Sequence, residues 1–160
     1  MYTLQNNENT LEVSEDFIKN SKTLSNMLND LDSWDSDEPI PLPIDIIILS
    51  KFYLFYNNVK YFSCDNNNLI TYLEDNLDEY IEKYPNKNVN PPFYDKILEL
   101  YKDLSLEDIK EYIKIADFLN MLGITRIISL IYALYIKNIE DYDEKLEIYK
   151  KMRQRLGHIN

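Results

Sequence analysis

The stretch Ile115-Ala-Asp-Phe-Leu-Asn-Met-Leu-Gly123 joins two predicted helices near the middle of an apolar region. The first helix begins after Ser105, whose hydroxyl can cap the first turn, with Asp108 three residues further on. Its inward-facing residues recur at helical spacing: Ile109, Ile113, Ala116 and Leu119. We expect this helix to stop near Gly123, because glycine favours helix C-termini, and an apolar helix to follow over 125–137. Two consecutive apolar helices predict a mainly helical core.

The N-terminal segment has the pattern of a β-hairpin. Tyr2-Thr-Leu-Gln5 and Thr10-Leu-Glu-Val-Ser14 alternate in polarity around the turn-forming run Asn6-Asn-Glu-Asn9. Side chains alternate across a strand, so one face would carry Leu4, Leu11 and Val13. Two short helices are expected next, over 14–20 and 21–31. A small sheet beside a helical core predicts an α/β (α+β) fold.

The acidic run 30–38 has alternating Asp residues, but it lacks the mid-loop Gly and the closing Glu of a calcium-binding loop. We therefore interpret it as a solvated loop. The prolines in Ile40-Pro-Leu-Pro43 exclude a helix and favour a short edge strand. The mostly apolar residues 45–57 predict a helix buried on most of its faces.

Residues 57–92 form a polar, Asn-rich insertion in which one amphipathic helix is predicted over 69–84. A short helix over 94–101 follows. From residue 139 the chain is charged and amphipathic, which predicts a helical extension over 139–160. We therefore expect one domain over 1–138 with an insertion at about 57–92, followed by that extension.

The composition restricts the function. The 160 residues carry 28 Asp and Glu against 17 Lys and Arg, a formal charge of -11, which argues against nucleic-acid binding. The chain has one cysteine, Cys64, and one histidine, His158, so disulfide frameworks, Cys/His zinc sites and catalytic dyads are nearly excluded. The start is polar rather than signal-like, and the apolar stretch 124–136 is shorter than the roughly 20 residues that span a bilayer. We expect an intracellular, cytoplasmic or nuclear protein without cofactor, metal or enzymatic activity.

Several motifs, in order, resemble the adaptor subunit of SCF-type cullin–RING ubiquitin ligases, the SKP family of the BTB/POZ fold. The segment Ser21-Lys-Thr-Leu-Ser-Asn-Met-Leu28 is similar to the family's "S-x-T-I-x-x-M-L" helix, and Pro41-Leu-Pro43 to its "PLP" strand. Ile115–Gly123 is similar to "A-A-N-Y-L-D-I-x-G", and Ala133-Leu-Tyr-Ile-Lys-Asn138 to "A-x-x-I-K-G". The resemblance covers about 1–138, with the insertion poorly matched.

The resemblance implies a non-catalytic adaptor that bridges a cullin N-terminal region to an F-box protein. The family's cullin-facing "N-Y" pair matches Asp117 and Phe118, where Asp replaces a neutral amide and adds a charge. The F-box surface would rest on C-terminal helices, and the expected residues are Ile127, Ile131, Tyr135, Leu146, Tyr149 and Met152. The family's further C-terminal helix is matched only at its beginning, so this surface would be shortened.

Three alternatives stay open at the level of sequence. An elongin C-like adaptor has the same fold, but the long C-terminal helices and the "PLP" strand argue against it. A BTB-type self-association module, or a decoy that occupies a partner without recruiting substrate, would use similar apolar surfaces. An enzyme with carboxylate acid/base chemistry would depend on the acidic run 30–38, which has the pattern of a solvated loop.

Overall fold

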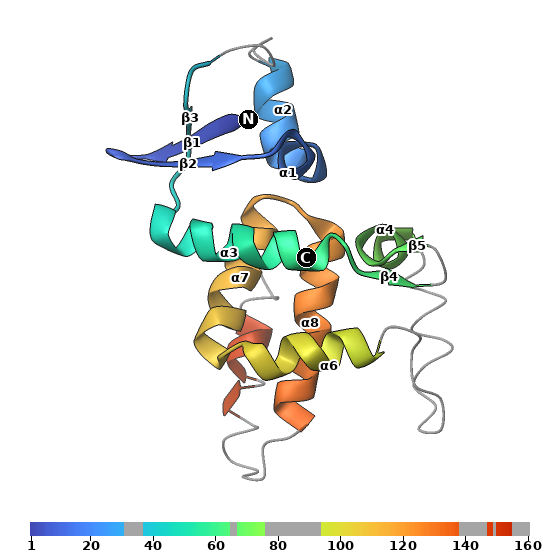
Figure 1. Ribbon diagram of the computed structural model, residues 1–160. Helices are drawn as coiled ribbons and strands as arrows, with labels where there is room; N and C mark the ends of the chain where they lie inside the picture. The colour runs from blue at the N-terminus through green and yellow to red at the C-terminus, as the bar shows by residue number, and fades with distance from the viewer. Residues whose placement is uncertain (31–36, 65–66, 76–93, 138–146, 149, 155–160) are drawn as a thin grey trace.

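A computed structural model describes residues 1–30, 37–64, 67–75, 94–137, 147–148 and 150–154. In this part of the chain a small sheet with two short helices lies at one end, and a larger group of helices lies at the other (Figure 1). The long helix α3 (Ile46–Val59) runs between the two groups. The predicted mixed fold, a mainly helical core with a small sheet, is confirmed.

The N-terminal hairpin forms as predicted. Strands β1 (Tyr2–Asn6) and β2 (Asn9–Val13) pair antiparallel, with Leu4 opposite Leu11. Asn7 takes the left-handed conformation in the turn, with φ 54°, which asparagine tolerates better than most residues. Leu4 and Val13 are fully buried, so the alternating residues face the core.

Strand β3 (Ile40–Pro41) adds to the other side of β1 in parallel, which gives the sheet order β2-β1-β3. The predicted edge strand is therefore confirmed. Pro41 has no N–H, and an edge position spares it one side of the ladder. The next residue, Leu42, donates its N–H to the Gln5 carbonyl over 2.8 Å and continues the pairing.

Two short helices connect the sheet to the rest of the molecule. Ser14 caps α1 (Glu15–Asn20), and its side chain accepts a hydrogen bond from the Phe17 N–H. The Phe17 ring makes edge-to-face contacts with Tyr53 and Tyr56 of α3, with ring centroids 5.1 Å apart in both cases. Helix α2 (Lys22–Asp30) follows and buries Leu24 and Leu28. The ring contacts hold α1 against α3, and α2 packs on α1.

The remaining helices form the larger group. Helix α4 (Leu69–Asp75) follows the short strands β4 (Ser63–Cys64) and β5 (Asn67–Asn68) and packs against α8 (Leu122–Lys137). Helices α6 (Tyr94–Asp103) and α7 (Leu106–Phe118) also pack on α8. The predicted capping box of α7, formed by Ser105 and Asp108, is present in both directions. No helix in the described ranges is long and apolar enough to cross a membrane.

Two predictions about this group are wrong in detail. Helix α7 ends at Phe118, and Asn120 rather than Gly123 takes the left-handed conformation after it, with φ 52°. Helix α8 begins at Leu122, three residues before the predicted start, so Gly123 lies in its first turn. The hydrogen bond from the Thr125 N–H to the Met121 carbonyl closes that turn. Gly123 therefore does not end a helix. It lies at the start of α8, which packs against α4.

The helix predicted over 45–57 is present and is buried or half-buried on most of its sides, but one side is exposed. Asp45 caps α3, with its Oδ1 accepting from the Ile47 and Ile48 N–H groups. Its buried side includes Leu49, Phe52 and Tyr56, but Ile47 and Leu54 are 67% and 65% exposed. An apolar run without periodicity cannot show which of its sides the rest of the chain covers.

Several predictions concern residues outside the described ranges. Most of the acidic run 30–38 is among them. The insertion helix predicted over 69–84 is described only as α4, which ends at Asp75. In the predicted extension 139–160, residues 147–148 and 150–154 are helical, and the rest lies outside the description.

Candidate interaction surface

The large hydrophobic side chains that are exposed in the described part of the chain fall into two groups, apart from Met1. Phe118 and Leu122 lie at the turn between α7 and α8. Ile47, Leu54 and Tyr61 follow the outer side of α3 and its C-terminal end. Exposed apolar side chains that cluster mark protein contact sites more often than scattered ones do.

The α7–α8 turn contains the predicted cullin-facing pair. Phe118 is 43% exposed and Leu122 is 42% exposed, while the residues between them include the fully buried Leu119. Asp117 is also exposed, so the predicted pair lies on the surface together. Leu122 was not predicted as a surface residue, because the sequence pattern extends the first helix to about Gly123, whereas Leu122 begins α8. Its exposure depends on where α8 begins.

Helix α2 holds this turn in place. Its capping residue Ser21, fully buried, donates its hydroxyl to the Leu119 carbonyl over 2.6 Å. Thr23 donates its hydroxyl to the Phe118 carbonyl over 2.8 Å, and its N–H to the Leu119 carbonyl over 3.3 Å. The Lys22 N–H donates to the Asn120 carbonyl over 3.4 Å.

These bonds satisfy two sets of backbone groups at once. The first N–H groups of α2 and the last carbonyls of α7 have no partners within their own helices. The positive end of one helix dipole also meets the negative end of the other. Phe118 is therefore presented from a backbone segment bonded directly to a second element of the fold.

The predicted F-box residues are placed differently from one another. Ile127 and Ile131 are fully buried within the core, so they do not lie on a surface of the described fold. Tyr135 and Met152 are half-buried and pack against the core. Leu146 and Tyr149 lie outside the described residues. Tyr135 and Met152 are thus the described members that a partner could reach.

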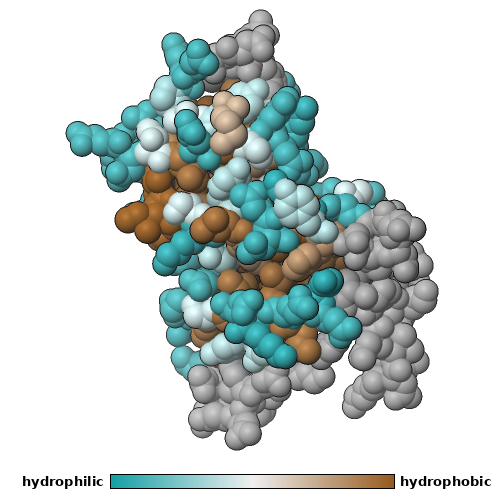
Figure 2. All heavy atoms as spheres, viewed as in Figure 1, coloured by the Kyte–Doolittle hydropathy of each residue, from teal (hydrophilic) through white to brown (hydrophobic). Residues whose placement is uncertain are grey.

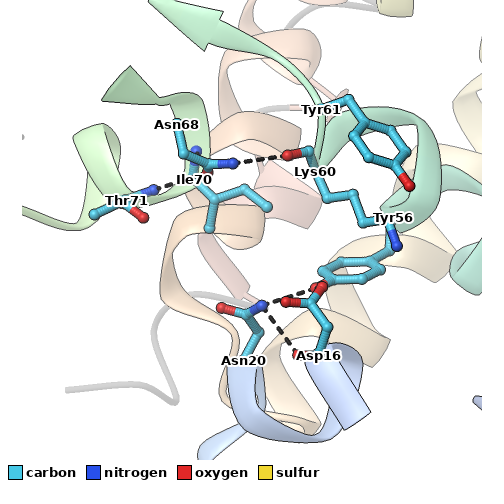
Figure 3. A pocket seen from close by; sticks show the side chains of 8 residues that line it. All are labelled: Asp16, Asn20, Tyr56, Lys60, Tyr61, Asn68, Ile70 and Thr71. Carbon is cyan, nitrogen blue, oxygen red and sulfur yellow. Dashed lines mark hydrogen bonds between the residues drawn. The ribbon is translucent and has the colours of Figure 1, made fainter. Parts of the chain in front are cut away.

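A polar depression of about 430 Å³ lies between α1, the end of α3 and the start of α4 (Figure 3). The Tyr56 hydroxyl donates to the Asp16 carboxylate and accepts from the Asn20 amide over 2.7 Å. The Asn68 amide donates to the Lys60 carbonyl over 2.7 Å and also accepts from the Ile70 N–H. These hydrogen bonds connect α1 to α3, and they connect β5 to the C-terminal end of α3 and to α4. The side chains therefore stabilise the packing of these elements.

The depression has little capacity for acid/base chemistry. Burial is the main cause that raises the pKa of Tyr56, and the hydrogen bond and negative charge of Asp16 raise it further. The hydroxyl therefore stays protonated at neutral pH and cannot act as a base or nucleophile there. Within the described ranges no cluster of three metal-ligating side chains is present. Cys64 lies in β4, and His158 lies outside the description.

No protein-family model, curated protein or solved structure matches the chain. The likeness to the SCF adaptor family therefore depends on the sequence motifs quoted above, and it stays a prediction.

Proposed function

We propose that the chain is a non-catalytic adaptor that bridges a cullin scaffold to F-box substrate receptors in ubiquitin-dependent protein degradation. The observation that carries the proposal is the exposed Phe118, beside Asp117, on a turn bonded to α2. Phe118, which the motif resemblance assigns to cullin binding, is thus an exposed aromatic residue whose backbone carbonyl is hydrogen-bonded to α2.

The energetics of this surface favour a protein partner. An aromatic residue that acts as an interface hot spot contributes about 2 kcal/mol or more when a partner covers it. Because the hydrogen bonds from Ser21 and Thr23 already order the turn, binding loses little further backbone entropy. Leu122 extends the apolar contact beyond Phe118. Asp117 gives the surface a negative charge, which favours a basic patch on the cullin side.

The F-box surface is proposed along the far end of α8. Tyr135 and Met152 supply partly exposed apolar contacts, and the buried Ile127 and Ile131 support the helix from beneath. A partner helix that packs on this end follows the helix-in-groove mode of recognition. Changing Tyr135→Asp should weaken F-box binding and leave cullin binding unchanged.

The decisive experiment is the double change Asp117→Lys with Phe118→Lys. Binding of a cullin N-terminal region and of an F-box protein is measured by calorimetry on the same preparation. We expect cullin binding to fall at least a hundredfold, which is about 2.7 kcal/mol, and F-box binding to persist.

The matched control is Leu54→Lys, which places a charge on an equally apolar exposed position of α3, away from the turn. It should leave cullin affinity unchanged. Unchanged cullin affinity in the double variant, or no cullin binding by the original chain, would rule out the adaptor function.

A further inference from the structure

The polar depression between α1, the end of α3 and the start of α4 contains two side chains of opposite charge. Asp16 lies on α1, and Lys60 forms the C-terminal cap of α3. The volume of about 430 Å³ is within the range that is usual for small-molecule sites. Figure 2 shows hydrophobic residues gathered where α3 begins, at the opposite end of the helix from this depression.

The depression is separate from the proposed cullin surface. The described residues that line it belong to α1, α3 and its C-terminal end, β5 and α4, and none of them belongs to α7 or α8. Binding at this depression therefore does not depend on the adaptor function, and it leaves the turn at Phe118 accessible.

The two charged side chains are held by neutral groups and not by each other. The Asp16 carboxylate accepts a hydrogen bond from the Tyr56 hydroxyl. The Lys60 ammonium group lies 5.9 Å from the centre of the Tyr56 ring and 5.1 Å from that of the Tyr61 ring. In the part of the chain that the structure describes, neither Asp16 nor Lys60 forms an ion pair. In Figure 3 the Tyr56 ring lies between the two charged groups.

Each charged group keeps hydrogen-bonding capacity for a ligand. The Asp16 carboxylate has a second oxygen beside the one that accepts from Tyr56, and an ammonium group has three N–H donors. The Asn20 amide nitrogen donates to the Tyr56 hydroxyl and to the Asp16 carbonyl, and within the described ranges the amide oxygen has no donor. The depression therefore offers oxygen acceptors for a cation near α1 and N–H donors for an anion at Lys60.

The rim of the depression adds an aromatic surface. Tyr61 is 78% exposed, and it lines the depression together with the apolar side chain of Ile70. Aromatic rings attract each other in offset or edge-to-face arrangements beyond the effect of the buried area. A ligand with an aromatic ring therefore gains a contact at Tyr61 that a purely polar ligand does not.

We propose that the depression binds a free α-amino acid with an aromatic side chain. The ligand's ammonium group donates to the Asp16 carboxylate and to the Asn20 amide oxygen. Its carboxylate accepts from the Lys60 ammonium group, and its ring packs on Tyr61. Hydrogen bonds between charged groups are stronger than those between neutral ones, so the ligand improves on the neutral partners that hold both charges. Because the rim is exposed, we expect a dissociation constant of about 1 mM.

A titration of the full chain with L-phenylalanine, followed by nuclear magnetic resonance, tests the site. The backbone amide signals of residues 16–20, 60–61 and 68–71 should shift and saturate with one common dissociation constant. L-Alanine, which has both charges and no ring, should bind about fivefold more weakly.

Two analogues test the two charges on the original chain. N-acetyl-L-phenylalanine keeps the carboxylate and lacks the ammonium group, whereas phenethylamine keeps the ammonium group and lacks the carboxylate. Each should bind at least about fivefold more weakly than L-phenylalanine, because each loses a hydrogen bond between charged groups.

Two variants assign the charges to residues, and each has a matched control on the same helix. Lys60→Met keeps the length of the side chain and should weaken L-phenylalanine binding at least about fivefold, whereas Lys51→Met should not change it. Asp16→Asn keeps an acceptor for the Tyr56 hydroxyl and should weaken binding similarly, whereas Glu15→Gln should not. In Asp16→Asn, N-acetylation of the ligand should cause little further loss.

Four results would overturn the proposal. One is the absence of localised shifts up to about 10 mM L-phenylalanine. Binding of N-acetyl-L-phenylalanine or of phenethylamine as tight as that of L-phenylalanine would mean a site for a single charge. Equal effects of Lys60→Met and Lys51→Met would mean that only the net charge matters. Equal affinity for L-alanine would remove the contact with Tyr61 and thus the preference for an aromatic side chain.

Discussion

Gly123 in the first turn of α8 lies directly against the backbone of Ile70 in α4. A Cβ atom at Gly123 would come within 2.5 Å of the Ile70 carbonyl oxygen and 2.6 Å of its Cγ2 atom. The φ angle of Gly123 is not positive. The glycine is therefore needed for the close approach of α8 to α4 and not for an unusual backbone conformation.

We expect Gly123→Ala to destabilise the protein by about 1–3 kcal/mol, the usual cost of overpacking. Urea unfolding, followed by circular dichroism, measures the change in the free energy of unfolding. In a helix that has room for a methyl group, the same substitution stabilises by up to about 1 kcal/mol. A stabilised variant would therefore show that α4 does not approach α8 as described.

Arg126 joins the same two helices. Its guanidinium Nη1 donates to the Leu73 carbonyl and, over 2.8 Å, to the Glu74 carbonyl at the C-terminal end of α4. These carbonyls lack partners within the helix, and a cation also complements the helix dipole there. We expect Arg126→Met to cost about 1.5–3 kcal/mol and to speed amide exchange throughout α4. Arg126→Lys should recover part of the protection, and normal exchange in Arg126→Met would contradict this role.

Tyr56 should make stability depend on alkaline pH. Burial first, and then Asp16, raise the pKa of its hydroxyl above that of tyrosine in an unfolded chain, which is about 10. The folded state therefore holds this proton more tightly than the unfolded state does. The resulting stability is fully present below about pH 10 and is lost as the pH rises above that value.

Tyr56→Phe tests this dependence. The variant should lose about 1–3 kcal/mol at neutral pH, because the Asn20 amide and the Asp16 carboxylate lose a partner. Its unfolding free energy should also fall less steeply between pH 10 and 11 than that of the original chain. Tyr61→Phe, at a tyrosine that is 78% exposed, is the control and should retain the original slope.

Thr23 should affect cullin affinity indirectly, because it orders the turn that carries Phe118 and does not itself contact the cullin. Thr23→Val removes the hydroxyl that donates to the Phe118 carbonyl over 2.8 Å. We expect a loss of about 1 kcal/mol in stability, faster amide exchange at residues 118–122 and a cullin affinity reduced about fivefold. Thr71→Val, at an exposed position of α4, should change none of the three. Unaltered exchange at the turn would mean that α2 does not order Phe118.

Local patterns in the sequence determined a large share of the secondary structure. Alternating polarity around Asn6-Asn-Glu-Asn9 predicted the hairpin, and Ser14 and Ser105 marked the starts of two helices correctly. The prolines predicted the edge strand β3. These features follow from hydrogen bonds and backbone preferences within a few residues, so the sequence contains their physical cause.

Only the tertiary structure decided which faces of the apolar helices are covered. The sequence predicted Ile127 and Ile131 on a partner-binding surface and Leu54 in a helix buried on most of its faces, but the fold buries the first two and exposes the third. The fold also places Gly123 at the contact between α8 and α4. It joins the turn at Phe118 by a hydrogen bond to α2, a helix about a hundred residues away along the chain. Burial depends on which distant segment packs on a face, and hydrophobic periodicity carries no information about that partner.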